Sequence, residues 1–180
     1  MPEPESFISL KADCSRCASL CCVVFAFDRS ESFAIDKAAG EVCPNLGALG
    51  KCTVFENREE LGFPGCISYD CHGAGQVITQ TVFRGLSWRD DARLAPRMGA
   101  ALSVLRRLHE QLLLLQTAER LPLAPGERDR LSELRRGLLP HGDWTEADLA
   151  AYPVDKSIRE VRSFLTGLRH HVGSSASARN

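Results

Sequence analysis

"DCSRCASLCCVVFAFD", residues 13–28, carries four cysteines within nine positions: Cys14, Cys17, Cys21 and Cys22. If this stretch folds as a helix, the first three stand at i, i+3 and i+7 and share one face. Cys22 then points about 100° away from Cys21, because a helix turns once in about 3.6 residues. The apolar run "VVFAF" is also typical of a strand, so helix and strand both stay open for this segment.

Four further cysteines follow in the first half of the chain: Cys43, Cys52, Cys66 and Cys71. No cysteine occurs in the 109 residues after Cys71. Cysteines that only filled a core as small hydrophobic side chains would be spread over both halves of the chain. Their clustering therefore indicates a common chemical role.

Metal binding is the chemistry that this spacing favours. A C-x2-C pair brings two thiolates to one ion through a short chelate loop, and eight thiols make two tetrahedral sets of four. We predict that the metal ligands are Cys14, Cys17, Cys21, Cys22, Cys43, Cys52, Cys66 and Cys71. Zinc is favoured, although iron, an iron–sulfur cluster and Cu(I) also suit thiolate ligands. Two such sets need nearby cations, for which the sequence offers Lys11, Arg16, Lys37, Lys51 and Arg58.

The termini and the charge limit the function classes. The first residues, "MPEPESFISLKAD", are acidic and lack the apolar run of a secretory signal peptide, so we expect a cytoplasmic protein with reduced thiols. No segment approaches the roughly 18 apolar residues of a membrane span, so we expect no membrane association. The formal net charge of −1 argues against non-specific binding to nucleic acid.

Composition divides the chain in two. Residues 1–80 carry 6 Lys/Arg against 11 Asp/Glu, while residues 81–180 carry 16 against 12. We predict a mainly α fold, in which a cysteine-rich metal-binding module of loops, residues 1–80, packs on a bundle of three to four helices, residues 81–172. The loops leave room for a short β-hairpin, and residues 173–180 are predicted to be a disordered tail. Because the module has few large apolar residues, metal cross-links would supply the stability that its core lacks.

The helical half is predicted from the spacing of its apolar residues. A long helix is expected from about Pro96 to Leu121, with its core face formed by Met98, Ala101, Leu102, Leu105, Leu108, Leu112 and Leu115. Shorter helices are expected between Pro125 and Pro140 and after a Thr145 N-cap. The last is expected from about Asp155, with a stripe of Ile158, Val161, Leu165, Leu168 and Val172. By contrast, "VITQTVF", residues 77–83, has the composition of a strand.

Catalytic motifs are absent from the sequence: it has no Ser/His/Asp pattern, no P-loop and no H-E-x-x-H. We interpret His72 as a polar residue in a glycine-rich turn and His109 as a satisfied or exposed helix residue. His170 and His171 are expected at the surface, at the end of the last helix.

The cysteine pattern also resembles a known family. The run "CSRCASLCC", followed by "CPNL", "GKCTVF", Arg58, Cys66 and Cys71, is similar to the CxxCxxxCC family of zinc- or iron-chelating domains. The chain departs from that family's C-terminal pattern, because it lacks the R-P pair and places seven residues between Arg58 and Cys66. A nearer likeness is to the cysteine-rich N-terminal module that precedes pentapeptide-repeat arrays in some bacterial proteins.

That second likeness rests on "DCSRCASLCC", "FAIDKAAG", "CPNL", "GFPGC" and "YDCHGAGQ", and continues more loosely through "LSWRD" and "LRRLHEQL", over about residues 6–120. No repeat array follows, and we interpret the lone "ADLAA" at 147–151 as a helical turn. The broader family also resembles the cysteine cluster of flagellin lysine methylases, which implies an iron–sulfur cluster there, but this sequence has no methyl-donor motif.

Three hypotheses follow from the sequence. The first is a binding or accessory module that holds two or more metal ions, zinc favoured, and would also involve a protein partner. The second is an iron or iron–sulfur metalloenzyme or redox protein that uses the same cysteines. The third is a metal storage or transfer protein, for which adjacent thiols suit fast ligand exchange.

Overall fold

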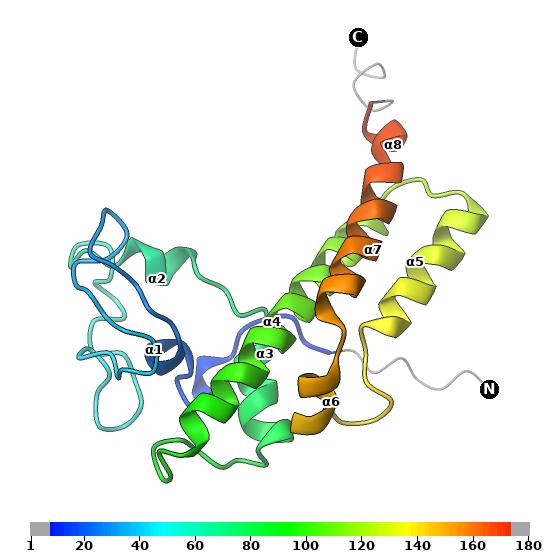
Figure 1. Cartoon of the computed structure of the whole chain (residues 1–180). Helices are drawn as coiled ribbons and strands as arrows, with labels where there is room; N and C mark the ends of the chain where they lie inside the picture. Colours follow the sequence, from blue (N-terminus) through cyan, green and yellow to red (C-terminus); the bar gives the residue numbers. More distant parts are fainter. Residues whose placement is uncertain (1–7, 174–180) are drawn as a thin grey trace.

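The computed structural model describes residues 8–173 and confirms the mainly α fold class (Figure 1). Short helices and turns occupy the first half of this range, and long helices the second. In chain order the helical elements are η1 Cys14–Arg16, α1 Cys21–Val24, α2 Pro64–Ser68, α3 Ala74–Val77, η2 Ile78–Val82, α4 Leu94–Ala118, α5 Pro125–Gly137, α6 Glu146–Ala151, α7 Val154–Gly167 and α8 Arg169–Gly173. Of the tail predicted at 173–180, only Gly173 is described, and the remainder lies outside these residues.

Helix α4 is the centre of the hydrophobic core, and α3, α6 and α7 pack on it (Figure 1). The predicted core face is confirmed, because all seven of its residues are buried: Met98, Ala101, Leu102, Leu105, Leu108, Leu112 and Leu115. Their spacing of three and four residues puts them on one stripe of a helix. No helix in the described part of the chain is both long and apolar enough to cross a membrane.

The C-terminal helices also form close to where the sequence places them. Thr145 is the N-cap of α6, where its Oγ1 accepts a hydrogen bond from the Asp148 backbone N–H at 3.1 Å. The Asp148 carboxylate accepts one from the Thr145 backbone N–H at 3.0 Å, which completes a capping box. The expected last helix is divided at Leu168 into α7 and α8.

The strand predicted for residues 77–83 is wrong. These residues continue α3 into η2, a π-helix. The β-branched and aromatic residues favour a strand only as an average, whereas the packing partners decide the conformation here. Residues Ile78 and Phe83 are buried in the core beside α4, and the polar residues between them bond to the N-terminal loop.

The cysteine-rich half consists mainly of loops. The predicted β-hairpin is wrong for the described residues, where the only β pairings are isolated bridges: Phe27 with Lys37, Ser30 with Phe33, and Leu46 with Cys52. The segment "VVFAF", for which helix and strand were both open, contains helical and extended residues. Helix α1 ends at Val24, and Phe25 is extended.

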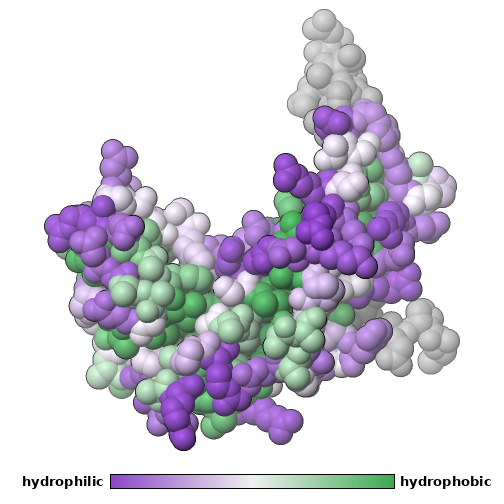
Figure 2. Space-filling view, viewed as in Figure 1, coloured by the Kyte–Doolittle hydropathy of each residue, from purple (hydrophilic) through white to green (hydrophobic). Residues whose placement is uncertain are grey.

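The two halves contact each other through α1 and α4. A Cβ on Gly99 would lie 3.2 Å from Cγ2 of Val24, so the glycine allows a close approach of the two helices. Trp88 strengthens the contact, since its indole N–H donates to the Ala18 carbonyl at 2.7 Å. In Figure 2 apolar surface continues from the loops toward the centre of the molecule, and the face is hollowed between the loops and α7.

Candidate metal centre

All eight cysteines lie in the loop half of the molecule and none forms a disulfide. Cys14 is in η1, Cys21 and Cys22 are in α1, and Cys66 is in α2. As whole residues, Cys14, Cys21 and Cys66 are exposed, Cys43 is buried, and the other four are intermediate. Residues separated by more than fifty positions in the sequence therefore share one region of loops, to the left of α4 in Figure 1.

A first group of thiols surrounds the N-terminus of α3. A Cβ on Gly75 would lie 2.8 Å from the Cys17 Sγ and 3.6 Å from the Cys71 Sγ, so both sulfurs approach the same glycine. Burial is the main cause that raises the pKa of Cys14, and the charges of Cys21 and Cys71 raise it further. Cys17 and Cys71 thus meet beside Gly75, and we place Cys14 and Cys21 with them in a first group, because the charges of Cys21 and Cys71 act on both Cys14 and Cys17.

A second group is held together by the backbone of the loop after α1. The Cys43 N–H donates to the Cys22 carbonyl at 2.8 Å, and the Leu46 N–H donates to the Cys43 carbonyl at 2.9 Å. Leu46 is in turn bridged to Cys52. Burial raises the pKa of the Cys66 thiol, and the charges of Cys21, Cys43 and Cys52 add to that rise. Backbone contacts thus link Cys22, Cys43 and Cys52, and we place Cys66 with them in a second group because the charges of Cys43 and Cys52 act on it.

Cys21 lies between the two groups. A hydrogen bond with the Cys22 side chain is the largest cause that raises the pKa of Cys21, followed by burial and by the charge of Cys22. Cys21 also raises the pKa of Cys17 and Cys66, which belong to different groups. The two groups are therefore in contact through the Cys21–Cys22 pair.

The sulfurs gather but do not close into tight ligand sets. Among residues 8–173, the only three or more ligand atoms of His, Cys, Asp and Glu that all lie within 4.8 Å of one another belong to Glu127, His170 and His171. Burial and the charges of neighbouring thiols raise the pKa values of Cys14 and Cys17. The eight cysteines thus share one region, their sulfurs do not form finished tetrahedra, and metal binding by them stays a prediction.

Polar residues of α3 and η2 fix the loop that bears Cys14 and Cys17. The Gln76 side chain accepts from the Asp13 N–H at 3.0 Å and donates to the Lys11 carbonyl at 2.8 Å. Thr79 Oγ1 accepts from the Ala18 N–H at 3.0 Å. These residues were not predicted as part of the site. Their spacing of three residues within an apolar segment was the available signal, because it matches one face of a helix rather than of a strand.

A buried histidine of α4 fixes the loop that bears Cys71. His109 is fully buried, and its Nδ1 donates to the carbonyl of His72 at 2.6 Å. His72 has a positive φ of 49°, and its backbone N–H donates to the Asp70 carboxylate at 2.7 Å. His72 is therefore a turn residue, as interpreted from the sequence. Its neighbour Cys71 is held against the helical half by His109.

Two of the expected cations lie near the thiols. Lys37 is only 4% exposed, and its Nζ donates to the carbonyls of Glu41 at 2.7 Å, Ala38 at 3.1 Å and Val23 at 3.4 Å. Burial lowers the pKa of Lys37, while the charge of Cys43 is the first of several that raise it. Arg58 donates to the Cys66 carbonyl at 3.0 Å and lowers the pKa of Cys14 and Cys66.

The donor set suits a soft metal ion. Eight thiolate donors in two groups of four match the coordination number of zinc and the ligands of iron–sulfur clusters. The charge of such a centre would be met by Lys37 and Arg58, and Gly75 leaves the space that the Cys17 sulfur occupies. The residues present therefore include donors of the kind that the predicted metal needs, although their sulfurs do not form a closed ligand set.

The comparisons with known proteins are sparse. The chain is 37% identical over 115 residues to YybG, an uncharacterized protein of Bacillus subtilis, an alignment that covers 64% of this chain. It spans only 41% of that relative's length. No family model matches the sequence, and no solved structure matches it.

Proposed function

We propose that this chain is a cysteine-rich metalloprotein that binds two metal ions, with zinc favoured, through its eight cysteines. Cys14, Cys17, Cys21 and Cys71 would hold one ion, and Cys22, Cys43, Cys52 and Cys66 the other. The observation that carries this proposal is the approach of Cys17 and Cys71, far apart in the sequence, to one glycine, Gly75. The likeness of "CSRCASLCC" to chelating domains supports the same conclusion.

The role proposed for the metals is structural. The loop from Phe25 to Phe63 contains no helix or strand in the described structure beyond isolated bridges. Few of its large side chains are buried, Phe63 being one. A segment of this kind seldom folds on apolar burial alone, so metal cross-links would account for its order. When bound, each ion would tie segments from both ends of the loop together.

An accessory role with a protein partner agrees with the surface of the loops. Five large hydrophobic side chains are exposed there: Val42, Leu49, Phe55, Leu61 and Ile67. Single exposed hydrophobic residues are ordinary, but this number on one loop half is more typical of a contact surface. A cytoplasmic location belongs to the same proposal, because it keeps the thiols reduced.

An iron–sulfur centre is the second candidate, and the Cys21–Cys22 contact favours it. Because this pair connects the two groups, the eight thiolates could surround one polynuclear centre instead of two separate ions. Such a centre would supply electron transfer or Lewis-acid chemistry when bound. The protein's own residues would set its surroundings through the cations Lys37 and Arg58.

Elemental analysis with an absorption spectrum tests the proposal, on protein purified without oxygen. We expect two zinc atoms per chain and no visible absorption, because each zinc takes four thiolates. The variant Cys66→Ser should lose one zinc, whereas the matched control Ile67→Ser, at an exposed neighbouring position, should keep both. If the protein instead contains iron and sulfide and absorbs visible light, the zinc proposal is wrong and the iron–sulfur centre is supported. Eight free thiols and no metal would contradict both.

A further inference from the structure

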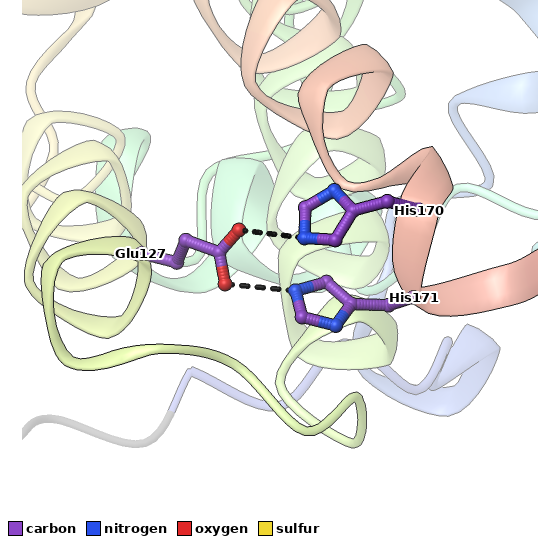
Figure 3. Close-up of side chains that lie close together, drawn as sticks. All are labelled: Glu127, His170 and His171. Carbon is purple, nitrogen blue, oxygen red and sulfur yellow. Dashed lines mark hydrogen bonds and ion pairs between the residues drawn. The ribbon is translucent and has the colours of Figure 1, made fainter. Parts of the chain in front are cut away.

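A second cluster of metal-ligating side chains lies between α5 and α8 (Figure 3). Glu127 is in the first turn of α5, and His170 and His171 are the second and third residues of α8. His171 Nε2 is 2.8 Å from Glu127 Oε2, and His170 Nε2 is 3.4 Å from Glu127 Oε1. Each imidazole therefore faces a different oxygen of the same carboxylate.

Hydrogen bonding fixes the orientation of His170. Its Nδ1 lies 2.9 Å from the carbonyl of Gly167, and a carbonyl can only accept, so Nδ1 carries a proton. In the neutral ring the lone pair is then on Nε2, which faces Oε1 of Glu127. Two electron-rich atoms at this separation require positive charge between or beside them, supplied by a proton or by a cation. An imidazole whose other nitrogen donates to a carbonyl is the usual arrangement of a metal ligand.

A proton on His170 is one way to meet this requirement, because His171 can donate a neutral Nε2–H to Glu127 Oε2, but a second charge on the neighbouring ring is unfavourable. The ring centroids of His170 and His171 are only 3.9 Å apart, so two imidazolium ions would repel each other. One divalent ion would instead attract both neutral rings and the carboxylate. It would place the positive charge where the three ligand atoms converge, because all of them lie within 4.8 Å of one another.

The surroundings hold the carboxylate and one ring in place. Glu127 Oε2 accepts a hydrogen bond from the Ala124 backbone N–H at 2.8 Å, which anchors the carboxylate at the start of α5. The His171 side chain is 12% exposed and the Glu127 side chain 23% exposed. His170 is 62% exposed, so solvent and ions reach the cluster from its side. His170 is exposed, as expected from the sequence, and His171 is half-buried.

We propose that Glu127, His170 and His171 form a binding site for one divalent transition-metal ion, of which zinc is the first choice. Two imidazole nitrogens and a carboxylate oxygen are preferred zinc ligands, at about 2.0–2.2 Å from the ion. The three side chains leave a fourth tetrahedral position for water. The ion would fasten α8 to the start of α5, far along the chain from the thiols and independent of them.

A zinc titration tests this site in the full chain. Protein whose cysteine groups are already saturated is titrated with further Zn²⁺ at pH 7.5, by calorimetry and by NMR of the histidine ring protons. We expect one additional equivalent, with shifts confined to the His170 and His171 resonances. Glu127→Gln and His171→Asn should each weaken this binding by tenfold or more. His141→Asn, an exposed histidine outside the cluster, should leave it unchanged.

The same titration can overturn the proposal. An extra equivalent that survives unweakened in both Glu127→Gln and His171→Asn would place the ion elsewhere, and no extra equivalent in the parent protein would exclude the site. Ring resonances that move with pH but not with Zn²⁺ would make the cluster an ion pair only. Because the thiols are saturated beforehand, these outcomes do not depend on which metal they bind. His170→Asn, at an exposed position, tests the ligand set if the variant at the half-buried His171 fails to fold.

Discussion

The two halves of this molecule are ordered by different forces. Around α4 a continuous core of buried Leu, Met and Trp side chains sets the helices, whereas the loops from Cys14 to Cys71 bury few large apolar residues. Their order instead comes from polar anchors such as Gln76 and Thr79, from the buried ammonium of Lys37, and, as we propose, from metal. A substitution in the apolar core lowers the stability in proportion to the contacts it removes, whereas the loss of one metal ligand would remove the whole ion.

Removal of metal should have the largest effect and should act on one half only. If the loops depend on two structural ions, a chelator should remove stabilisation on the order of 10 kcal/mol per ion. Amide hydrogen exchange should then become fast over residues 25–63 and stay slow in α4. Hydrogen exchange followed by mass spectrometry, before and after chelation, measures both halves in one experiment. Equal protection of the loops in the two states would contradict a structural role for metal.

A core substitution should produce the opposite pattern. Leu105 is fully buried in α4, so Leu105→Ala should lower the free energy of unfolding by about 2–5 kcal/mol through lost contacts and a cavity. Metal content should not change while the protein is folded. Denaturant unfolding with elemental analysis checks both statements. The control Leu114→Ala, 44% exposed on the same helix, should change stability by about 0.5 kcal/mol or less.

The same contrast explains how much of the structure could be predicted from the sequence. The core positions of α4 and the Thr145 cap were predicted correctly, because a helix repeats its pattern every few residues and its cap is local. Residues 77–83 were predicted wrongly as a strand. Their helical form depends on partners such as Ala18 and Arg16, which are more than sixty positions away. Local composition carries no information about such partners.

The candidate metal site divides in the same way. The eight candidate cysteines stand out by their spacing alone, and Lys37 and Arg58 are two of the five cations expected near them. The grouping of the thiols could not be derived, because it depends on the loop path that brings Cys71 beside Cys17. The Glu127 cluster was missed for the same reason. Its histidines were interpreted as surface residues of one helix, and their partner lies on another helix, more than forty positions away.

A substitution at Gly75 can sharpen the comparison. Replacing an ordinary helical glycine by alanine stabilises a protein, whereas we expect the same change at Gly75 to lower the free energy of unfolding. Gly75→Ala would place a Cβ 2.8 Å from the Cys17 sulfur, so we expect a loss of about 1–3 kcal/mol and weaker metal binding. Gly126→Ala in α5 meets no atom within 4 Å and should instead be neutral or stabilising by up to about 1 kcal/mol. Thermal unfolding with a metal competition assay separates the two. If Gly75→Ala is more stable than the parent and binds metal normally, the Cys17 sulfur does not lie close to Gly75 as described.

The smallest expected effect concerns His109, where the helical half holds the loop of Cys71. Burial lowers the pKa of His109 below its ordinary value of 6.5, so the unfolded chain binds a proton that the folded chain does not. Its contribution to stability is therefore complete above pH 6.5 and is lost as the pH falls through the lowered folded value.

The variant His109→Gln removes this titration, so the parent protein should lose more stability than the variant between pH 6.5 and 5. Acid also releases metal from thiolates, but that loss is common to both proteins and cancels in the difference between their free energies of unfolding. His141→Gln, at an exposed site, should follow the parent curve. Parallel curves for the parent and His109→Gln would mean that the neutral His109 ring does not contribute to holding the two halves together.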